Sequence, residues 1–253
     1  MINSSIDLFE DFFRNEPEST AFASGRVNLI GDHTDYNSGF VMPTPLSLGI
    51  EVSIRNTRTG FIEGKTELFK ETKTEINSNV DGSWLDFIKG AIKVFYEEFP
   101  NCSKKLKEGI QVAVTSNLPS GSGVSSSAAL EIALLRAINK IENQNLSEIK
   151  LAKLAQKIEH KFIGTLCGLM DQMVVSKGIM NKAMFFDTKY EKTVNLSLFS
   201  NFEFLIVHSG SQRSLSSSLY NERRSECEEA SKILNIENLR DAKFTMLSKL
   251  RGK

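Results

Sequence analysis

The chain has 253 residues, which is enough for one large domain or for one domain and part of a second. Hydrophobic residues make up 40% of it, charged residues make up 25%, and 31 basic residues balance 31 acidic ones, so the net charge is zero. This composition is typical of an ordinary soluble globular protein, and it excludes the strongly basic nucleic-acid-binding proteins. Three cysteines lie far apart without a CxxC pair, which argues against a disulfide framework or a zinc ribbon and favours a reducing cytoplasm.

The first part of the chain predicts one short helix and then strands. The N-terminal "MINSSIDLFEDFFRNEPEST" alternates acids with phenylalanines and lacks a basic n-region and an apolar h-region. It therefore predicts an amphipathic helix and neither a signal peptide nor a membrane span. The β-rich stretches that follow, with apolar runs broken by glycine and polar residues, are "TAFASGRVNLIG", "GFVMPTPLSLGIEVSIRNTRTG" and "FIEGKTELFKET".

Helices and strands then alternate. The stretch "GSWLDFIKGAIKVFYEEF" has apolar residues near helical spacing, with Ser83 as the expected N-cap. "GIQVAVTSNLP" predicts a strand with Ile110, Val112 and Val114 inward, and it runs straight into the predicted helix "SGSGVSSSAALEIALLRAINKI". A second helix, "LSEIKLAKLAQKIEHKFIG", is followed by the predicted strands "KAMFFDT" and "FEFLIVHSG" and by a long charged helix from about Ser214 to Ile236.

The loop "LPSGSGVSSSAA" is suited to binding a polyphosphate. Gly121 and Gly123 lack Cβ, so they can adopt positive φ and turn backbone N–H groups toward an anion. The helix that follows adds unpaired N–H groups and the positive end of its dipole. The loop has no lysine, so it is not a Walker A loop, and Mg²⁺ and residues elsewhere would neutralise the charge. A flexible Gly/Ser linker or a plain helix start is the alternative.

Two acidic side chains are candidates for chemistry. Asp171 lies among apolar residues in "CGLMDQM", so its carboxylate must be paired or have a raised pKa, which makes it a candidate base or orienter. The alternative is an N-cap aspartate at a helix start. Glu159, on the preceding helix, is either a solvated acid or a hard oxygen ligand for Mg²⁺.

The polar run "GDHTDYNSG" directly after the first strand has two interpretations. Asp, Asn, Ser and Gly are turn formers, so it could be a plain polar turn. It could also carry binding groups. The three histidines of the chain show no metal-ligand spacing, which argues against a zinc site.

Five stretches of the chain, taken in order, carry a family resemblance. "GRVNLIGDHTDYNSGFVMPTPL" is similar to the galactokinase signature, and "LPSGSGVSSSAALEIA" to the second conserved motif of the wider GHMP small-molecule kinase superfamily. "EHKFIGTLCGLMDQM" resembles the galactokinase segment that holds the catalytic aspartate. "WLDFIKGAI" and "SLSSSLYNERRSECEEA" resemble two further galactokinase stretches. Ordered matches from about residue 20 to the end are far more specific than one Gly/Ser loop.

The resemblance implies a role for each matching residue. Arg26 and Asp171 would form the catalytic pair, in which the carboxylate meets the anomeric hydroxyl of the sugar and the guanidinium offsets charge on the transferring phosphoryl group. The residues expected to line the sugar pocket are Asp32, His33, Asp35, Gly168 and Tyr220. Asp35 would accept hydrogen bonds from two neighbouring hydroxyls and so read their stereochemistry.

The resemblance also implies which residues bind the nucleotide and its metal ion. The loop residues expected to cradle the phosphates are Gly121, Ser122, Gly123, Val124, Ser125 and Ser126. Ser127 and Glu159 would hold Mg²⁺. Trp84 would lie near the adenine, although a lone tryptophan at helical spacing is more often a core residue.

The chain departs from the family pattern at three places. Most galactokinases have glutamate where this chain has Asp32, which moves the charge back by about one methylene. The family usually has a basic side chain at the position of Gln212, so one phosphate-side contact would either be lost or be taken over by Arg213. The family continues through a second domain with a third, glycine-rich motif, whereas this chain ends at "LRDAKFTMLSKLRGK" and is expected to be truncated at its C-terminus.

The resemblance therefore predicts an α+β fold. Residues 1–200 would form a GHMP kinase N-terminal domain related to the ribosomal S5 domain 2-like fold, and residues 201–253 the start of an incomplete C-terminal α/β sandwich domain. The expected activity is phosphorylation of galactose by ATP, with Mg²⁺, by a cytoplasmic monomer without nucleic-acid or membrane partners. The alternatives are a kinase of a related sugar such as N-acetylgalactosamine, a non-catalytic sugar and ATP sensor, and an inactive fragment.

Overall fold

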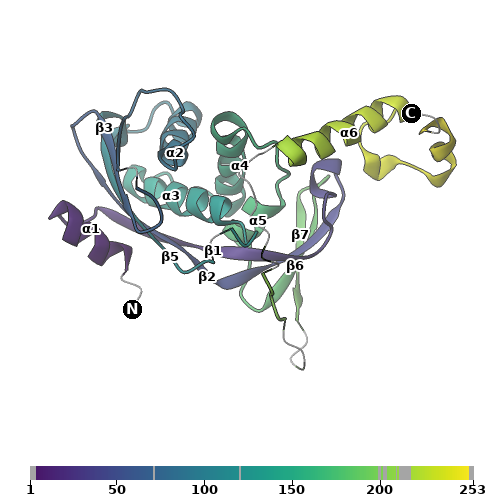
Figure 1. Ribbon diagram of the computed structural model, residues 1–253, viewed down its shortest axis with the longest axis horizontal. Coiled ribbons are helices and arrows are strands. Elements are labelled where there is room, and N and C mark those ends of the chain that lie inside the picture. The colour runs from purple at the N-terminus through teal and green to yellow at the C-terminus, as the bar shows by residue number, and fades with distance from the viewer. Residues whose placement is uncertain are drawn as a thin grey trace.

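A mixed sheet with helices packed on it makes up most of the computed structural model (Figure 1). The structure describes residues 4–70, 72–119, 121–198, 201, 204–208, 210 and 218–250. The strands of these residues are β1 (Ser19–Ile30), β2 (Phe40–Asn56), β3 (Phe61–Thr66), β4 (Lys73–Glu75), β5 (Ile110–Ser116), β6 (Lys182–Asp187) and β7 (Lys192–Ser197). The helices are α1 (Ser5–Phe13), α2 (Leu85–Glu98), α3 (Ser126–Glu142), α4 (Glu148–Ile158), α5 (Met170–Lys177) and α6 (Ser218–Leu234).

The long strand β2 organises the sheet. The strand order is β4-β3-β5-β2-β6-β7, and β1 also pairs with β2. β2 is antiparallel to β1, to β5 and, through its first two residues, to β6, whereas β3 and β5 are parallel. Because one strand joins all these partners, the two ends of the sheet form a single framework.

The two faces of the sheet carry different helices. Val52 and Ile54 of β2 are fully buried in the main hydrophobic cluster, which also contains side chains of α2, α3 and α4. Ser53 lies between them and therefore points to the opposite face, where its hydroxyl lies 2.8 Å from that of Ser5 in α1. A smaller cluster, with Met173 and Phe186 fully buried, joins α5 to β6.

The elements around the phosphate loop agree with the sequence. β5 ends at Ser116, α3 begins at Ser126, and Ile110, Val112 and Val114 are buried as expected. The N-terminal helix, the first strands, the helices α2 and α4 and the strand β6 also lie where the sequence predicts them. The α+β prediction is confirmed.

Several predicted details are wrong. The N-cap of α2 is Trp84, not Ser83, because Asp86 accepts hydrogen bonds from the backbone N–H groups of Asp81 and Gly82 and so folds the entry to the helix by itself. No strand forms at 204–208, since no neighbouring strand among the described residues offers these exposed residues a ladder. β7, which the sequence analysis missed, pairs with β6.

Two further observations concern the predicted helices. The charged helix α6 is described from Ser218 to Leu234, and residues 211–217, which include Gln212 and Arg213, lie outside the described part of the chain. Within the described residues, no helix is both long and apolar enough to cross a membrane.

Strand β1 is tied to the phosphate loop by a close backbone approach. The β1–β2 register shifts between Ser24 and Arg26, and the Arg26 N–H bonds to the carbonyl of Val124 at 3.0 Å. A Cβ at Gly25 would lie 2.6 Å from the Leu118 side chain and 2.9 Å from the Val124 carbonyl oxygen. Glycine is needed here because any side chain would push the loop away from the strand.

We expect Gly25→Ala to destabilise the protein by about 1–3 kcal/mol, since the added methyl overpacks the contact with the loop. Urea unfolding followed by circular dichroism measures this change. Ser24→Ala, which only removes an atom at the adjacent position, is the control and should lie close to the wild type. Equal midpoints for Gly25→Ala and the wild type would contradict the close approach.

Candidate functional site

An ion pair between the buried Arg26 of β1 and the partly buried Asp171 of α5 forms the centre of the site. The guanidinium of Arg26 donates from Nε to Oδ1 of Asp171 at 2.7 Å and from Nη2 to Oδ2 at 2.6 Å. Arg26 is only 7% exposed, and its Nη1 donates to the Gly123 carbonyl at 2.7 Å. Bidentate pairs of this kind fix both partners in direction as well as distance. The two residues predicted as a catalytic pair, 145 positions apart, are therefore in direct contact.

Asp171 is not an N-cap. The N-cap of α5 is Leu169, and Asp171 is the second residue of the helix. Its carboxylate instead accepts hydrogen bonds from Arg26 and from the hydroxyl of Ser125, which lies 2.5 Å from Oδ2. The alternative left open by the sequence is thus wrong, because the carboxylate is oriented by side chains across the site.

The phosphate loop leaves donors free at the start of α3. Ser125 is the N-cap of α3, with φ of 59°, but its side chain makes no capping hydrogen bond because it bonds to Asp171. Gly121 and Gly123 have φ of 67° and 73°, as the sequence predicts. An uncapped first turn presents its backbone N–H groups and the positive end of the helix dipole to a ligand.

The other loop residues divide into supporting and exposed ones. The hydroxyl of Ser122 donates to the Pro119 carbonyl at 2.7 Å, so it braces the loop. Val124 is buried in the main hydrophobic cluster and anchors the loop to the core. Ser126 is exposed at the beginning of α3. The loop is therefore held from beneath, by Val124 and by the Arg26 contacts, rather than being a free linker.

On the other side of Asp171, the polar run after β1 forms a compact loop whose own contacts use some of its side chains. Thr34 donates to the Gly31 carbonyl and Asn37 donates to the His33 carbonyl, both at 2.7 Å. These residues do what a plain turn requires. His33 also bonds within the loop, with its Nδ1 2.5 Å from the Tyr36 hydroxyl, whereas Asp35 accepts the Tyr36 N–H with Oδ1 at 2.9 Å and turns Oδ2 toward Gly168.

Asp35 is the residue of this loop that faces the centre of the site. A Cβ on Gly168 would lie 2.1 Å from the Asp35 carboxylate, so only glycine permits the carboxylate to sit there. Burial, and to a smaller extent the negative charge of Asp171, raises the pKa of Asp35 to about 6, against opposing contributions from the Tyr36 N–H and Arg26. The loop after β1 and the loop before α5 therefore meet at Asp35 and Gly168.

Tyr220 of α6 covers the same loop. Its ring stacks on His33 with centroids 6.0 Å apart and meets Tyr36 edge-on at 5.3 Å. Burial raises the pKa of Tyr220, as does the nearby charge of Asp35. Asp32 is more exposed and accepts a hydrogen bond from Asn28 at 2.7 Å. The loop after β1, the loop before α5 and the start of α6 thus meet here, with Asp32 at the edge.

Ser127 and Glu159 lie together behind the phosphate loop. Glu159 is 5% exposed, and burial raises its pKa, against hydrogen bonds with the side chains of Ser127 and Thr165 that lower it. Over the described residues, no cluster of three or more His, Cys, Asp or Glu side chains could hold a metal ion. The pair is instead a small set of hard oxygen donors, the kind that binds Mg²⁺ together with phosphate oxygens.

Glu131 is an acid that the sequence analysis missed. It is fully buried in α3, and neither of its carboxylate oxygens has a hydrogen-bond partner among the described residues. Burial raises the pKa of Glu131 well above its ordinary value, and the charges of Glu159 and Asp171 raise it further. Its position one helical turn after Ser127 was the available signal, because residues four apart share a helix face.

Trp84 lies in the hydrophobic core, the alternative that the sequence left open. It is 6% exposed, and a Cβ on Gly64 would lie 2.5 Å from its indole ring. Phe69, which is 51% exposed, stacks on it with ring centroids 6.2 Å apart. The indole therefore packs between β3, α2 and Phe69.

Asp35→Asn should raise Tm by a few degrees at pH 8 and leave it almost unchanged at pH 4. The folded-state pKa is raised, so the penalty for the buried carboxylate appears as pH rises through about 6 and is absent below the unfolded pKa. Thermal unfolding at both pH values measures the difference. Asp32→Asn removes the same charge from an exposed side chain and is the control; an equal gain at pH 4 and pH 8 would contradict the burial of Asp35.

Comparisons of sequence and structure relate this chain to known proteins. Residues 86–178 match the GHMP kinases N terminal domain, and residues 7–56 match the galactokinase galactose-binding signature. A galactokinase of Haemophilus influenzae is 33% identical over 100% of this chain and 68% of its own length, and one of Clostridium perfringens is 33% identical over 94% and 63%. The crystal structure of Lactococcus lactis galactokinase complexed with galactose superposes with a TM-score of 0.84 at 26% identity, covering 98% of this chain and 67% of that one. The chain therefore belongs to the galactokinase family of the GHMP kinases.

Proposed function

We propose that this site transfers the γ-phosphoryl group of ATP to the anomeric hydroxyl of galactose, which gives galactose 1-phosphate and ADP. The observation that carries the proposal is the position of Asp171. Its carboxylate is bonded at once to Arg26 and to Ser125 of the phosphate loop. Asp35 and Gly168 meet on its other side. A sugar hydroxyl held there would therefore face a phosphate bound at the start of α3.

The ion pair supplies the chemistry of the transfer. Asp171 accepts the hydrogen bond of the anomeric hydroxyl, and takes its proton as the oxygen forms a bond to phosphorus and ADP leaves. The Arg26 guanidinium orients that carboxylate and offsets negative charge on the transferring group. Because Arg26 is already fixed by Asp171 and the Gly123 carbonyl, little reorganisation is needed when substrate binds.

The sugar is recognised by the loop after β1. An ionised Asp35 accepts hydrogen bonds from two neighbouring hydroxyls, so an epimer with one hydroxyl turned away would leave an acceptor unpaired. His33 and the more exposed Asp32 contact other hydroxyls, and Tyr220 covers the loop from α6. The pocket therefore favours galactose over its epimers.

The residues present fit a magnesium ion bound with ATP. Ser127 and Glu159 would hold it, and the ion would neutralise charge on the phosphates. Burial, and to a smaller extent neighbouring carboxylates, raises the pKa values of Glu159 and Glu131. A polyphosphate bound beside them would disfavour their ionised forms further unless a cation lay between them. The three free cysteines suit a reducing compartment such as the cytoplasm.

We also propose that the N-terminal GHMP domain spans residues 1–200 and that a further unit begins at 201. Every strand of the sheet among the described residues lies before residue 198. Both hydrophobic clusters draw their buried members from residues up to 186. α6 instead joins the site mainly through polar and aromatic contacts.

A kinase assay with Mg·ATP on a panel of hexoses tests the activity. We expect galactose to be phosphorylated in preference to glucose and N-acetylgalactosamine, and Asp171→Asn to lower kcat by about 10²–10⁴-fold because it removes the proton acceptor. Calorimetry should show that the variant still binds galactose, and circular dichroism that it is folded. Phosphorylation of another sugar while galactose is neither bound nor phosphorylated would overturn the assignment.

The KM for galactose should rise by nearly tenfold per pH unit as pH falls below about 6. Protonation of Asp35 in that range replaces one acceptor with a donor, and the pKa of the group is about 6. Initial rates between pH 5 and pH 8 measure it. Asp35→Asn should raise KM at least about tenfold and abolish this slope, whereas the KM for ATP serves as the internal control. A slope that persists in Asp35→Asn would assign it to another group.

A further inference from the structure

One face of α6 contacts the loop that leads to α5. Asn221 accepts a hydrogen bond from the Leu166 N–H and donates one to the Gly164 carbonyl, both at 3.0 Å. Arg224 donates from Nη1 to the Leu166 carbonyl at 2.6 Å. Asn221 and Arg224 are three residues apart, so they lie on the same face of the helix. The first turns of α6 therefore bond to backbone groups of Gly164 and Leu166, in a loop far away in the sequence (Figure 1).

These contacts matter because Asn221 and Arg224 supply the backbone hydrogen bonds of Leu166 that the described residues show. The Leu166 side chain is 42% exposed, so it does not anchor the loop in the core. The residues on either side are also held from α4 and the turn after it. The Gly164 and Thr165 N–H groups bond to the Glu159 carbonyl, and the Cys167 carbonyl lies 3.2 Å from Nε2 of Gln156 and 2.9 Å from Nε2 of His160. Leu166 is thus the point of the loop that depends on side chains of α6.

The position of this loop sets the position of the site. Gly168 lies two residues after Leu166 and is in close contact with Asp35. Asp171 follows at the second residue of α5. Tyr220, next to Asn221, stacks on His33. α6 therefore touches both loops that bring Asp35 and Asp171 together.

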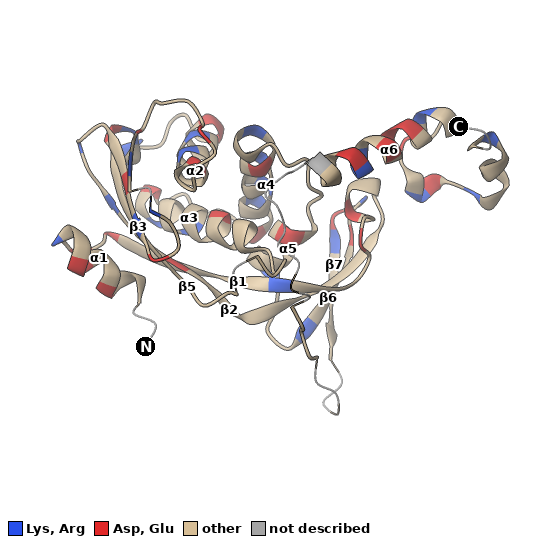
Figure 2. Cartoon of the chain, in the orientation of Figure 1, with Lys and Arg blue, Asp and Glu red and all other residues tan. Residues whose placement is uncertain are grey.

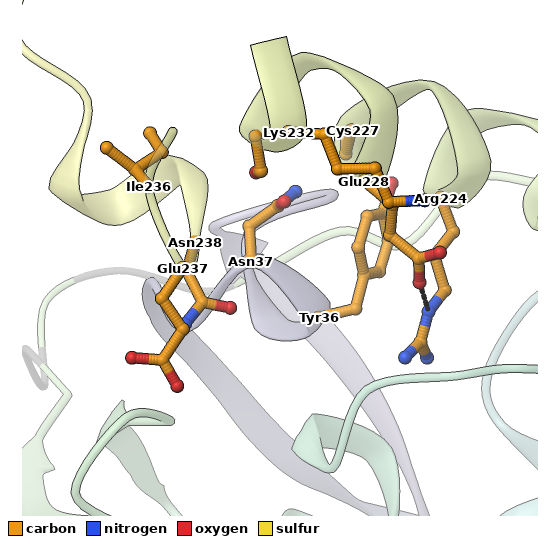
Figure 3. A pocket seen from close by; sticks show the side chains of 10 residues that line it. Tyr36, Asn37, Arg224, Cys227, Glu228, Lys232, Ile236, Glu237 and Asn238 are labelled. Carbon is orange, nitrogen blue, oxygen red and sulfur yellow. Dashed lines mark hydrogen bonds and ion pairs between the residues drawn. The ribbon is translucent and has the colours of Figure 1, made fainter. Parts of the chain in front are cut away.

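A hydrogen bond within α6 orients the Arg224 side chain toward the loop. Its Nε donates to Glu228 one turn further along α6 at 3.0 Å, the contact drawn in Figure 3. Arg224 also lines, with Tyr36 and Cys227, a cavity of about 230 Å³ between α6 and the loop after β1 (Figure 3). The neighbouring Arg223 is 52% exposed and pairs only with glutamates of α6 in the contacts that the described residues show. Acidic and basic side chains are interspersed along the helix (Figure 2). Arg223 and Arg224 carry the same charge, so they differ in their contacts and not in their charge.

We propose that Asn221 and Arg224 are positioning residues, which hold the 164–168 loop so that Gly168 seats Asp35 and Asp171 meets the sugar hydroxyl. This inference rests on the proposed phosphoryl transfer to galactose. Neither residue touches the reacting atoms. They act through the backbone of Gly164 and Leu166, and their loss lets the loop move away from the sugar while leaving the phosphate loop in place.

The kinetic test compares two adjacent arginines. Arg224→Met should lower kcat/KM for galactose by about 10–100-fold, as expected for a charge-assisted hydrogen bond, with a higher galactose KM and an unchanged KM for ATP. Arg224→Lys should recover part of the loss, and Arg223→Met, the matched control, should behave as wild type. A purely structural role would lower the active fraction and shift neither KM. Equal effects of Arg224→Met and Arg223→Met would overturn the proposal.

Hydrogen exchange gives a readout that does not depend on activity. Asn221→Ala removes the acceptor of the Leu166 N–H, so exchange in a peptide covering 164–169 should become faster by about tenfold or more, while peptides from β5 stay unchanged. Unchanged exchange in that peptide would overturn the inference even in an active kinase. Faster exchange in a protein whose wild type leaves galactose unphosphorylated would instead contradict the proposed function.

Discussion

The arrangement of the site depends on the ion pair between the buried Arg26 and the partly buried Asp171. A guanidinium that is only 7% exposed must be fully paired, because an unpaired buried charge costs several kcal/mol. Asp171 pairs two of its nitrogens, and the Gly123 carbonyl takes the third. One side chain of β1 therefore fixes both the first turn of α5 and the phosphate loop. The sheet, the loop and the helix cannot shift independently without leaving this charge unsatisfied.

Around this pair the protein keeps carboxyl groups in surroundings that disfavour their charge. The pKa values of Asp35, Glu131 and Glu159 are all raised, mainly by burial. Such an arrangement weakens the fold as pH rises, but it prepares acceptors for hydroxyl groups and for a cation. Natural sites often sacrifice stability in this way, because the groups that bind a ligand are unsatisfied before it arrives.

Much of the fold could be predicted from the sequence where local and tertiary signals agree. The alternation in β5, the glycines after it and the helix α3 all depend on short-range patterns, and each was predicted correctly. The strand expected at 202–210 was wrong for 204–208, because an apolar run shows that residues avoid water but not which partner strand completes the ladder. The contacts of Asn221 and Arg224 were missed, since hydrogen bonds to a distant backbone leave no local pattern. Glu131 was missed because its place one turn after Ser127 shows a shared helix face but not that its carboxylate is buried without a partner among the described residues.

The sequence by itself determined the chemical groups and their local geometry: a glycine loop before a helix, a polar run after a strand and an acid in an apolar stretch. It also narrowed the choice of protein family, because five motifs in the same order are seldom accidental. Only the tertiary structure decided which of these groups meet. It paired Arg26 with Asp171, brought Gly168 against Asp35, moved Trp84 into the core and laid α6 across the loop before α5. The physical reason is that local patterns record the preferences of neighbouring residues, whereas contacts between segments are set by which buried charges and backbone groups must be satisfied together.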